Sequence, residues 1–476
     1  MVILLTYQDF EKAADKVAFI ENAIAEHRQS AEYLQAVNAE LYDQQKNVTI
    51  NSVVRTIYTA AGIPLNDPTS SNNKIASNYF HRLNNQRVSY LLGNGVSFTK
   101  HVKTVEVEGK PIKVDETKDE LGTDFDTQVF NTVYSGETRG QSFMYIEYDS
   151  ARGYNYHLFP LTEFVPLLDE TDGRLRVGIR FWSLDWENKP VTAVLYESDG
   201  VTRYRTKNGN KGLNLEEVEP KHGYNKVVVS TRATGPEDIG YENLFSDIPI
   251  VPYYGRNKTS TLEGMQAAID SYDLIQSGFA NDLQDCAQIY WLVGGSLGMD
   301  DTALKKFRER LIFQHIGVAD LDNSTVTPYT NEIPYEARVS YLNHIRNSIY
   351  EGFGALDVTA INSGNRTATE IQAAYEALEQ EADALESRVT LFIRQLLRLI
   401  GIDDIPTYKR NKISNQLEQT QMIVMAAEYL SERAILDKLP WVTVDEIETI
   451  LAEKAGEIDE REEKGGDLNT GLGELT

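Results

Sequence analysis

The chain contains very little cysteine. Among its 476 residues Cys286 is the one cysteine, so no disulfide can form within the chain. A small disulfide-stapled secreted fold is therefore excluded, and we expect a reducing compartment or an assembly that is indifferent to redox conditions. Cys286 has no histidine beside it in the sequence, which favours a packed structural thiol over a nucleophile.

Long apolar runs are also missing. The apolar start at residues 1–5 is short and follows no basic segment, which does not fit a signal peptide. The most apolar later stretch, at 391–402, carries Arg394 and Arg398, and a membrane-spanning helix needs about 20 predominantly apolar residues. We expect a protein that does not cross a membrane.

Basic residues are scarce relative to acidic ones. Lys plus Arg number 46 and Asp plus Glu number 72, which gives a formal net charge of −26. A protein that holds duplex DNA non-specifically is usually basic, because its affinity comes from neutralising phosphates. The charge excludes that class. Hydrophobic residues make up 41% of the chain, which predicts an ordered protein, and the length predicts two to four domains at roughly 100–200 residues each.

Catalytic and metal-binding motifs are mostly absent. The sequence has no phosphate-binding G-x-x-x-x-G-K-[ST], no H-E-x-x-H, and seven scattered histidines, so we predict no metal and no cofactor. Residues 294–298 read Gly-Gly-Ser-Leu-Gly and fit G-x-S-x-G, which leaves an acidic serine esterase-like enzyme using Ser296 as one alternative. That enzyme also needs a parallel sheet and a later acid and histidine, so a Gly-rich turn is favoured and the protein is predicted not to be an enzyme.

Hydrophobic periodicity predicts the first half of the chain. Apolar residues at helical spacing indicate amphipathic helices over 7–45 and a helix over 73–92 that ends at Gly93. Between 142 and 232 the period changes to two, with turn pairs at Asp172-Gly173 and Asp199-Gly200. This pattern predicts an antiparallel meander.

The second half is predicted to be mainly helical. Capping boxes begin at Ser260 and Thr367 and predict helices over 260–287 and 367–400. Between them we predict a short strand at 289–293, a basic helix at 301–313, a helix at 335–350 and a polar loop at 352–364. The helix from Thr367 would be about 50 Å long, and its four-three apolar stripe requires a neighbouring helix from the same chain or from another subunit. Further helices are predicted over 413–431 and from Thr443.

Several stretches resemble one family, the portal proteins of long-tailed bacteriophages. The first group of matching residues comprises Asn72-Asn73-Lys74-Ile75, Asn78-Tyr79-Phe80, Gln86-Arg87-Val88, Tyr90-Leu91-Leu92-Gly93-Asn94, Val96 and Phe98. The second comprises Ile248-Pro249-Ile250-Val251-Pro252-Tyr253, Ala268-Ile269-Asp270-Ser271-Tyr272-Asp273, Ser277 and Asn281-Asp282. The third comprises Leu430-Ser431, Leu436, Leu439-Pro440-Trp441-Val442 and Glu446. Together they span about residues 70–465.

The resemblance implies an α+β subunit with a named order of parts. These are a mixed helical and antiparallel-β wing at 1–258, a first stem helix at 259–287, a small α/β clip at 288–334, a second stem helix at 335–352, a channel loop at 353–366, a long heptad-patterned wing or channel helix at 367–401, and a helical crown at 402–476 with an acidic, partly mobile tail.

The resemblance further implies a ring of about twelve copies around a channel at one vertex of the viral capsid. Double-stranded DNA would be packaged through it by the terminase motor and later ejected, and the ring would connect head to tail. The implied partners are the terminase large subunit, the head–tail adaptor and the major capsid and scaffold proteins, in the virion and in the host cytoplasm during assembly. The predicted DNA-facing loop residues are Asn362, Ser363, Asn365 and Arg366, and the predicted docking residues of the clip are Lys305, Lys306, Arg308 and Arg310. A non-catalytic acidic scaffold is the remaining alternative.

Overall fold

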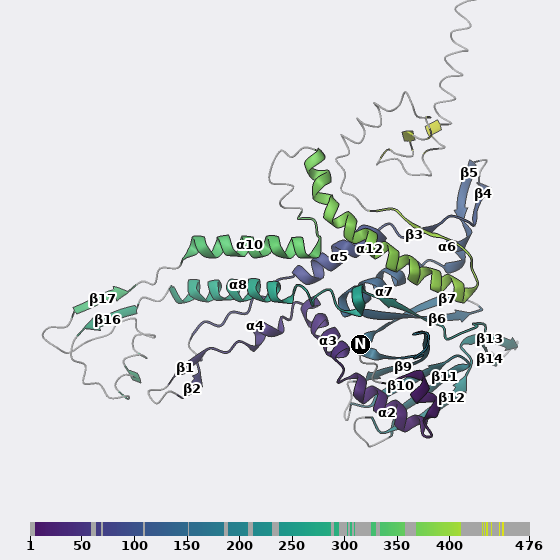
Figure 1. The fold of residues 1–476 in the computed structure, drawn as a ribbon, viewed down its shortest axis with the longest axis horizontal. Helices are drawn as coiled ribbons and strands as arrows, with labels where there is room; N and C mark the ends of the chain where they lie inside the picture. Colours follow the sequence, from purple (N-terminus) through teal and green to yellow (C-terminus); the bar gives the residue numbers. More distant parts are fainter. Residues whose placement is uncertain are drawn as a thin grey trace, which may run out of the picture.

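The computed structural model describes residues 5–58, 63–67, 70–107, 110–150, 152–184, 189–207, 213–230, 238–286, 290–294, 325–329, 334–357 and 368–410, with isolated residues at 302–309 and 431–451. Within these residues a body of two sheets and several helices carries a long arm of two helices (Figure 1). The predicted helices at 413–431 and from Thr443 lie almost wholly outside the described residues.

The N-terminal segment is helical, as its periodicity predicts. Its helices are α1 (Tyr7–Lys12), α2 (Lys16–His27), α3 (Ala31–Asp43) and α4 (Val48–Ser52). A side-chain oxygen caps each start, from Thr6, Asp15, Ser30 and Asn47 respectively, and satisfies a backbone N–H that has no partner inside the helix. These caps set the helix starts.

The next segment differs from its prediction. After the short hairpin of β1 (Thr56–Tyr58) and β2 (Pro64–Asn66), helix α5 covers Tyr79–Leu92. The predicted start at residue 73 is wrong, because residues 71–78 are irregular and their backbone binds another helix instead. The predicted end at Gly93 is confirmed.

The strand-rich region forms two sheets rather than one meander. The first sheet is antiparallel throughout, with neighbours in chain order: β8 (Phe164–Leu168), β9 (Leu175–Ser183), β10 (Val191–Glu197), β11 (Gly200–Thr206) and β12 (Leu215–His222). Here the predicted meander is confirmed, and Gly173 turns the chain between β8 and β9 with φ of +68°.

The second sheet has the order β14-β13-β6-β15, with β7 paired to β6. Its strands are β6 (Gln141–Asp149), β7 (Gly153–Pro160), β13 (Asn225–Ser230), β14 (Asp238–Glu242) and β15 (Ile250–Tyr254). Since β13 pairs with β6 in parallel, a single meander over 142–232 is wrong. Helix η1 (Leu161–Glu163) carries the chain from β7 to the first sheet. Aromatic side chains such as Phe143, Phe159 and Phe164 fill the space between the sheets.

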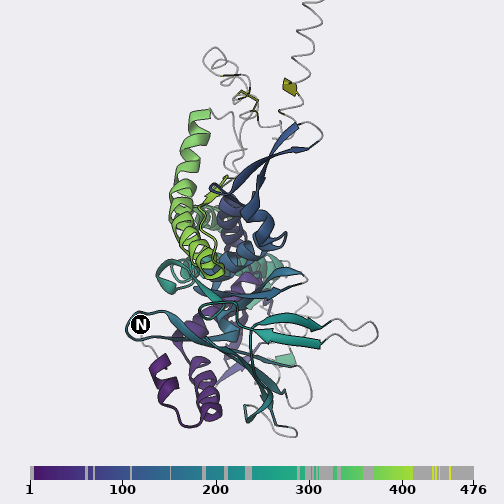
Figure 2. The ribbon, with the colours of Figure 1, turned by 90° about the vertical axis from the view of Figure 1, so that its right-hand side faces the viewer.

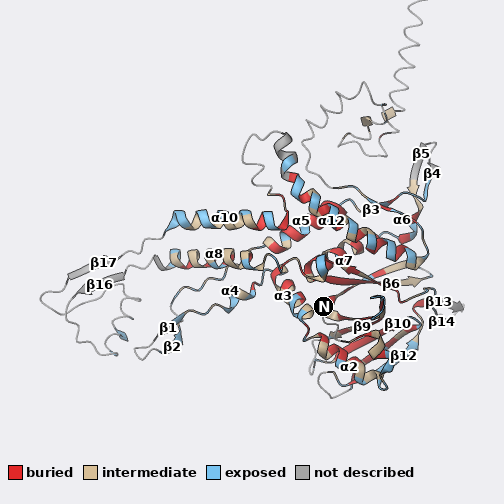
Figure 3. Ribbon diagram, viewed as in Figure 1, coloured by how far each residue is buried: buried red, intermediate tan, exposed pale blue. Residues whose placement is uncertain are grey.

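The arm consists of α8 (Gln266–Cys286) and α10 (Tyr335–Phe353), which lie side by side, with the antiparallel pair β16 (Tyr290–Gly294) and β17 (Thr325–Tyr329) beyond their ends (Figure 1). Residues 261–265 form turns, so α8 begins six residues later than its capping box predicts. The Ser260 hydroxyl still accepts a hydrogen bond from the N–H of Leu262 at 3.1 Å. Much of α10 is exposed (Figure 3).

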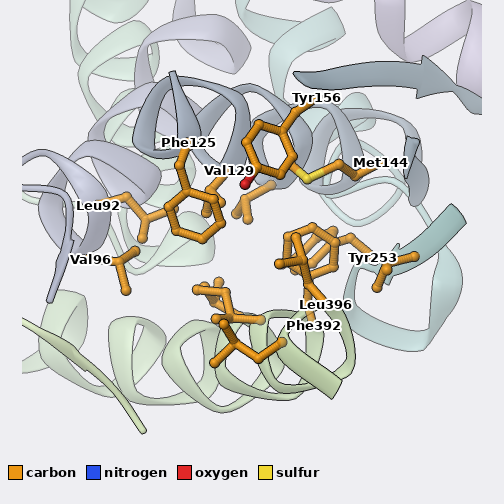
Figure 4. Close-up of a cluster of buried hydrophobic side chains, with 14 of the residues drawn as sticks. Leu92, Val96, Phe125, Val129, Met144, Tyr156, Tyr253, Phe392 and Leu396 are labelled. Atoms are coloured by element: carbon orange, nitrogen blue, oxygen red, sulfur yellow. The ribbon is translucent and has the colours of Figure 1, made fainter. Parts of the chain in front are cut away.

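Helix α12 (Ala368–Ile400) confirms the predicted long helix, and Gly401 ends it with φ of +84°. Its apolar stripe is buried at Tyr375, Leu378, Ala382, Leu385, Val389, Phe392 and Leu396. The covering neighbour is the body of the same chain, chiefly α5 and β15, and apolar side chains of α7 (Phe125–Arg139) belong to the same buried cluster. Figure 4 shows Phe392 and Leu396 facing the side chains of the body, and the rings of Phe392 and Tyr253 meet edge to face at 5.8 Å.

The chain after α12 returns to the body at β18 (Pro406–Tyr408), which pairs with β3 (Val96–Phe98). Next to β3 stand α6 (Glu116–Leu121) and the hairpin of β4 (Val102–Val107) and β5 (Lys110–Asp115). This hairpin and the helices α1 and α2 lie at opposite ends of the body (Figure 2).

Asp404 stabilises the junction between the segment that follows α12 and the residues that follow β3. Its carboxylate accepts hydrogen bonds from the N–H groups of Thr99, Lys100, His101 and Ile405 and from the hydroxyl of Thr117, at 2.7 to 3.3 Å. Burial alone would raise the pKa of Asp404, but these donors outweigh burial and lower the pKa from 3.8 to about 2. The ionised carboxylate is thus the form that holds the junction.

We predict that Asp404→Asn lowers the free energy of unfolding by about 2 kcal/mol at pH 7. Because the folded pKa lies below the unfolded one, this contribution is present above about pH 4 and is lost as the pH falls toward 2, so it should be roughly halved at pH 3. Urea unfolding of wild type and variant at both pH values measures it. Asp403→Asn is the matched control, since the Asp403 side chain is 92% exposed. Equal losses for the two variants would contradict the prediction.

Candidate functional site

Of the predicted channel loop at 353–366, the structure describes residues 353–357. Asn362, Ser363, Asn365 and Arg366 lie outside the described residues. At the first end, Gly354 follows α10 with φ of +59°. Beyond it the guanidinium of Arg346 donates to both carboxylate oxygens of Asp357, at 2.9 and 2.7 Å.

Gln86 of α5 also holds the first end of the loop. Its side-chain amide donates to the carbonyl of Leu356 at 2.9 Å and accepts from the N–H of Leu356 at 3.0 Å. The pair of bonds imitates the exchange between two strands. The chain therefore leaves the arm toward residues 358–367 from a fixed position.

The clip residues are described only in part. Lys305 and Lys306 are exposed residues in helical conformation, whereas Arg308 and Arg310 lie outside the described residues. Ser296 also lies outside them. The strand that precedes it, β16, pairs antiparallel with β17, while a nucleophile elbow follows a strand of a parallel sheet. The described surroundings thus do not fit the esterase-like alternative.

An extended segment at 73–77, here called the strap, lies along the arm helix α8. The N–H of Asn73 donates to the side chain of Asn281 at 2.6 Å, that of Ile75 to Ser277 at 3.0 Å, and that of Ser77 to Asp273 at 3.0 Å. Two residues of extended chain span about 6.6 Å and four residues of helix about 6 Å, so alternate N–H groups match successive helical turns.

The three side chains of α8 that bind the strap are buried, with exposed fractions of 0% for Asp273, 6% for Ser277 and 3% for Asn281. Burial raises the pKa of Asp273, while hydrogen bonds from Ser77 and Asn47 oppose that shift. A buried polar group without a hydrogen-bond partner costs free energy. Losing any of these three hydrogen bonds would therefore destabilise the contact between the strap and α8. Asp273, Ser277 and Asn281, like Asn73 and Ile75, belong to the stretches that carry the family resemblance.

A second polar group joins the arm to the N-terminal helices. Asp270 of α8 accepts hydrogen bonds from the Tyr42 hydroxyl, from Asn47 at 2.9 Å and from Thr49 at 2.8 Å. Burial and the bond to Asp270 raise the pKa of Tyr42 to about 12. The base of the arm is thereby fixed to α3 and α4.

The opposite face of α8 packs on α10. The rings of Phe279 and Tyr335 lie 5.7 Å apart, Ser271 bonds Tyr341 at 3.2 Å, and Asp282 pairs with Arg338. Asp273 and Asp282 are nine residues apart, or about two and a half turns, so they project from opposite sides of the helix. Helix α8 is thus held between the strap and α10.

A buried ion network secures α12 to the same region. Glu137 of α7 is fully buried and its carboxylate lies 3.0 Å from the Arg388 guanidinium, 3.8 Å from that of Arg87, and 2.7 Å from the donating Tyr253 hydroxyl. Arg87 also pairs with Glu381 at 3.3 Å. Burial alone would lower the pKa of Arg388, but the negative charge of Glu137 outweighs it and raises the pKa.

Among the described residues, no three His, Cys, Asp or Glu side chains lie close enough together to hold a metal ion. None of the described helices is both long and apolar enough to span a bilayer.

The described residues form an α+β subunit with a two-helix arm and the long helix α12, in agreement with the fold class that the resemblance implies. A sequence profile described as "Phage portal protein, SPP1 Gp6-like" matches residues 20–460. The chain belongs to this family.

Two relatives carry the same name. The portal protein of Clostridium phage phiCD119 is 25% identical over 460 residues, which cover 92% of this chain and 96% of the relative. The portal protein of Bacillus phage SPP1 is 24% identical over 435 residues, which cover 87% and 82%. The predicted family is therefore confirmed.

The strap is not among the elements expected from the sequence, because residues 73–78 fall within the stretch predicted to be helical. One signal for the strap was available, since Asp273, Ser277 and Asn281 place polar side chains at steps of four on one face of an amphipathic helix. A polar row that is buried requires a polar partner, which here is an extended backbone.

Proposed function

We propose that the protein assembles into a ring of about twelve copies at one capsid vertex, where double-stranded DNA is packaged through the ring by the terminase motor and later ejected, and where the ring joins head to tail. The observation that supports this most is the arm, whose helix α8 is covered on two opposite faces and open on the two between them. Portal family membership supplies the biological setting.

The open faces of α8 carry one exposed leucine each. Leu274 is 39% and Leu283 is 55% exposed, and nine residues separate them, so they project from opposite flanks of the arm. In a ring, one flank of each copy meets the other flank of the next copy, which is a head-to-tail contact that closes on itself. We assign these flanks to contacts between neighbouring copies.

Replacing Leu274 or Leu283 by Asp should lower the fraction of chain in rings by at least about tenfold, because a buried unpaired charge at each repeated contact is costly. Size-exclusion chromatography with light scattering measures the fraction. Leu34→Asp is the control, since Leu34 is 56% exposed on α3. Mixing the two arm variants should give dimers but not rings, because each retains one intact flank. Normal rings from either variant would count against this assignment.

The parts of the family subunit map onto the described elements as a proposal. The body up to residue 258 is the wing, α8 and α10 are the stem, β16 and β17 belong to the clip, and α12 is the long helix next to the channel loop. We propose that the clip, with Lys305, Lys306, Arg308 and Arg310, docks first the terminase large subunit and then the head–tail adaptor. The capsid and scaffold proteins surround the ring in the assembling virion.

The negative net charge of the chain is compatible with a channel through which DNA moves. Twelve copies would carry −26 × 12 = −312 charges. A channel that gripped phosphates at twelve positions would hold DNA in place, whereas an acidic wall with a few polar contacts allows it to slide. Those contacts are proposed for Asn362, Ser363, Asn365 and Arg366, which follow the fixed stretch at Leu356 and Asp357.

Arg366→Glu should leave ring formation unchanged and reduce the length or yield of packaged DNA, because a repulsive charge replaces an attractive one beside the passing phosphates. Nuclease-protected DNA from complemented phage particles measures this, and Asp383→Asn, which changes an exposed α12 acid by one charge unit, is the control. Unchanged packaging would remove Arg366 from the proposed contacts.

Electron microscopy tests the proposal that the protein forms rings. Particles of 53.7 kDa instead of rings would overturn it.

A further inference from the structure

A groove lies where the end of α12 meets the turn end of the β6–β7 hairpin. Figure 1 shows these two ends on the side of the body away from the arm. Its volume is about 390 Å³. The described residues that line it are Glu120, Tyr148, Gly153, Tyr154, Leu244, Phe245, Leu399 and Ile400. A space of this size admits one or two side chains of a partner.

The groove wall is apolar and fixed in position. Tyr148 and Tyr154 are cross-strand neighbours whose rings lie 5.1 Å apart. Tyr154, Phe245, Leu399 and Ile400 pack against the main buried cluster of the body. Helix α12 ends directly below at Gly401, where the N–H of Ile402 returns to the carbonyl of Leu397 at 2.9 Å. A rigid aromatic wall is typical of protein interfaces, because little conformational entropy is lost on binding.

The rim of the groove is open. Leu244 is 59% exposed, which is unusual for a leucine that stands beside other apolar side chains at a concave surface. At Gly153 no atom lies within 4 Å of the position that a Cβ would occupy, so a backbone can approach there. The groove therefore offers an anchor pocket with room for an extended chain beside it.

The negative charge beside the groove favours a basic partner over an acidic one. Glu120 is exposed, and it is the one charged residue among the described lining residues. Its negative charge contributes to a raised pKa of Tyr154, after burial. Arg152 and Arg398 are sequence neighbours of lining residues but do not line the groove. With a chain of net charge −26 around it, an acidic ligand would be repelled.

We propose that this groove binds an extended peptide of a partner protein that carries an aliphatic or aromatic anchor next to a Lys or Arg. The anchor fills the space between Leu244 and the two tyrosines, and the base faces Glu120. The proposal does not depend on ring formation, because all lining residues come from one copy.

The test uses the full chain and a hexapeptide probe, acetyl-Gly-Ser-photoleucine-Lys-Lys-Gly-amide. After irradiation, mass spectrometry should place the crosslinks at 148–154, 244–245 and 399–400. An unlabelled peptide with Leu as anchor should compete for this labelling, and the same peptide with Ser as anchor should not. Labelling spread evenly over the surface would overturn the proposal.

Two exposed variants separate the anchor from the charge. Leu244→Asp should reduce labelling at least about tenfold. Glu120→Lys should do the same with the Lys probe and should gain labelling with a probe in which Glu replaces both lysines. Leu34→Asp and Glu376→Lys, which alter an exposed leucine and an exposed glutamate elsewhere, should change nothing. Labelling of the Leu274→Asp chain but not of wild-type rings would assign the groove to a second copy and overturn the proposal.

Discussion

Replacing Glu137 by Ala is expected to lower the free energy of unfolding by about 3–5 kcal/mol, because it removes the fully buried countercharge of the partly buried Arg388 guanidinium. The carboxylate of Glu137 lies 3.0 Å from the guanidinium of Arg388, and Glu137 is fully buried. Water therefore does not reach this carboxylate. The Tyr253 hydroxyl loses its acceptor as well.

Urea unfolding followed by tyrosine and tryptophan fluorescence measures this loss, with a chain kept monomeric by Leu274→Asp so that assembly does not contribute. Glu376→Ala is the matched control, because Glu376 is an exposed glutamate on α12. We expect the control to change the free energy by less than about 0.5 kcal/mol. A loss below about 1 kcal/mol for Glu137→Ala would show that the network does not hold α12 to the body.

The strap should show an alternating pattern of hydrogen exchange. The N–H groups of Asn73, Ile75 and Ser77 are bonded to α8 and should exchange slowly. Those of Lys74 and Ala76 have no hydrogen bond within the described residues and should exchange fast. The contrast arises because successive N–H groups of an extended chain point to opposite sides.

Asp273→Ala should abolish the protection at Ser77 and lower the free energy of unfolding by about 2–4 kcal/mol, because the part-buried N–H of Ser77 and the buried side-chain amide of Asn47 lose their acceptor. Hydrogen exchange by mass spectrometry with fragmentation resolves single amides. Gln276→Ala, on another face of the same helix, is the control and should leave the strap protected. Uniform exchange across 73–77 in the wild type would refute the ladder.

These two features were accessible from the sequence to different degrees. Arg87 belongs to the stretches that resemble portal proteins. Its partner, Glu137, lies in α7, a helix that the periodicity did not single out. Pairing between positions so far apart depends on how α5, α7 and α12 cross, which no local pattern contains.

The sites that the family resemblance named remain predictions. Asn362, Ser363, Asn365 and Arg366 were placed on a loop because small and polar residues there precede a capping box. The structure describes the elements on either side of these residues, since α10 ends at Phe353 and α12 begins at Ala368. What holds the loop's first end, the side chain of Gln86, could not be predicted because it lies 270 residues away.

The sequence by itself determined the long helix to within one residue at its start, the antiparallel pairing of successive strands in part of the region at 142–232, and the exclusion of a protein that holds DNA by neutralising phosphates. Each of these depends on residues close together in the chain, or on the sum of charges, which needs no fold. The tertiary structure alone decided that the stripe of α12 packs on its own body, that the strands divide into two sheets, and that residues 73–77 bind α8 as a strap. A periodic pattern states which side chains must be buried, but the group that buries them is set by contacts between distant segments.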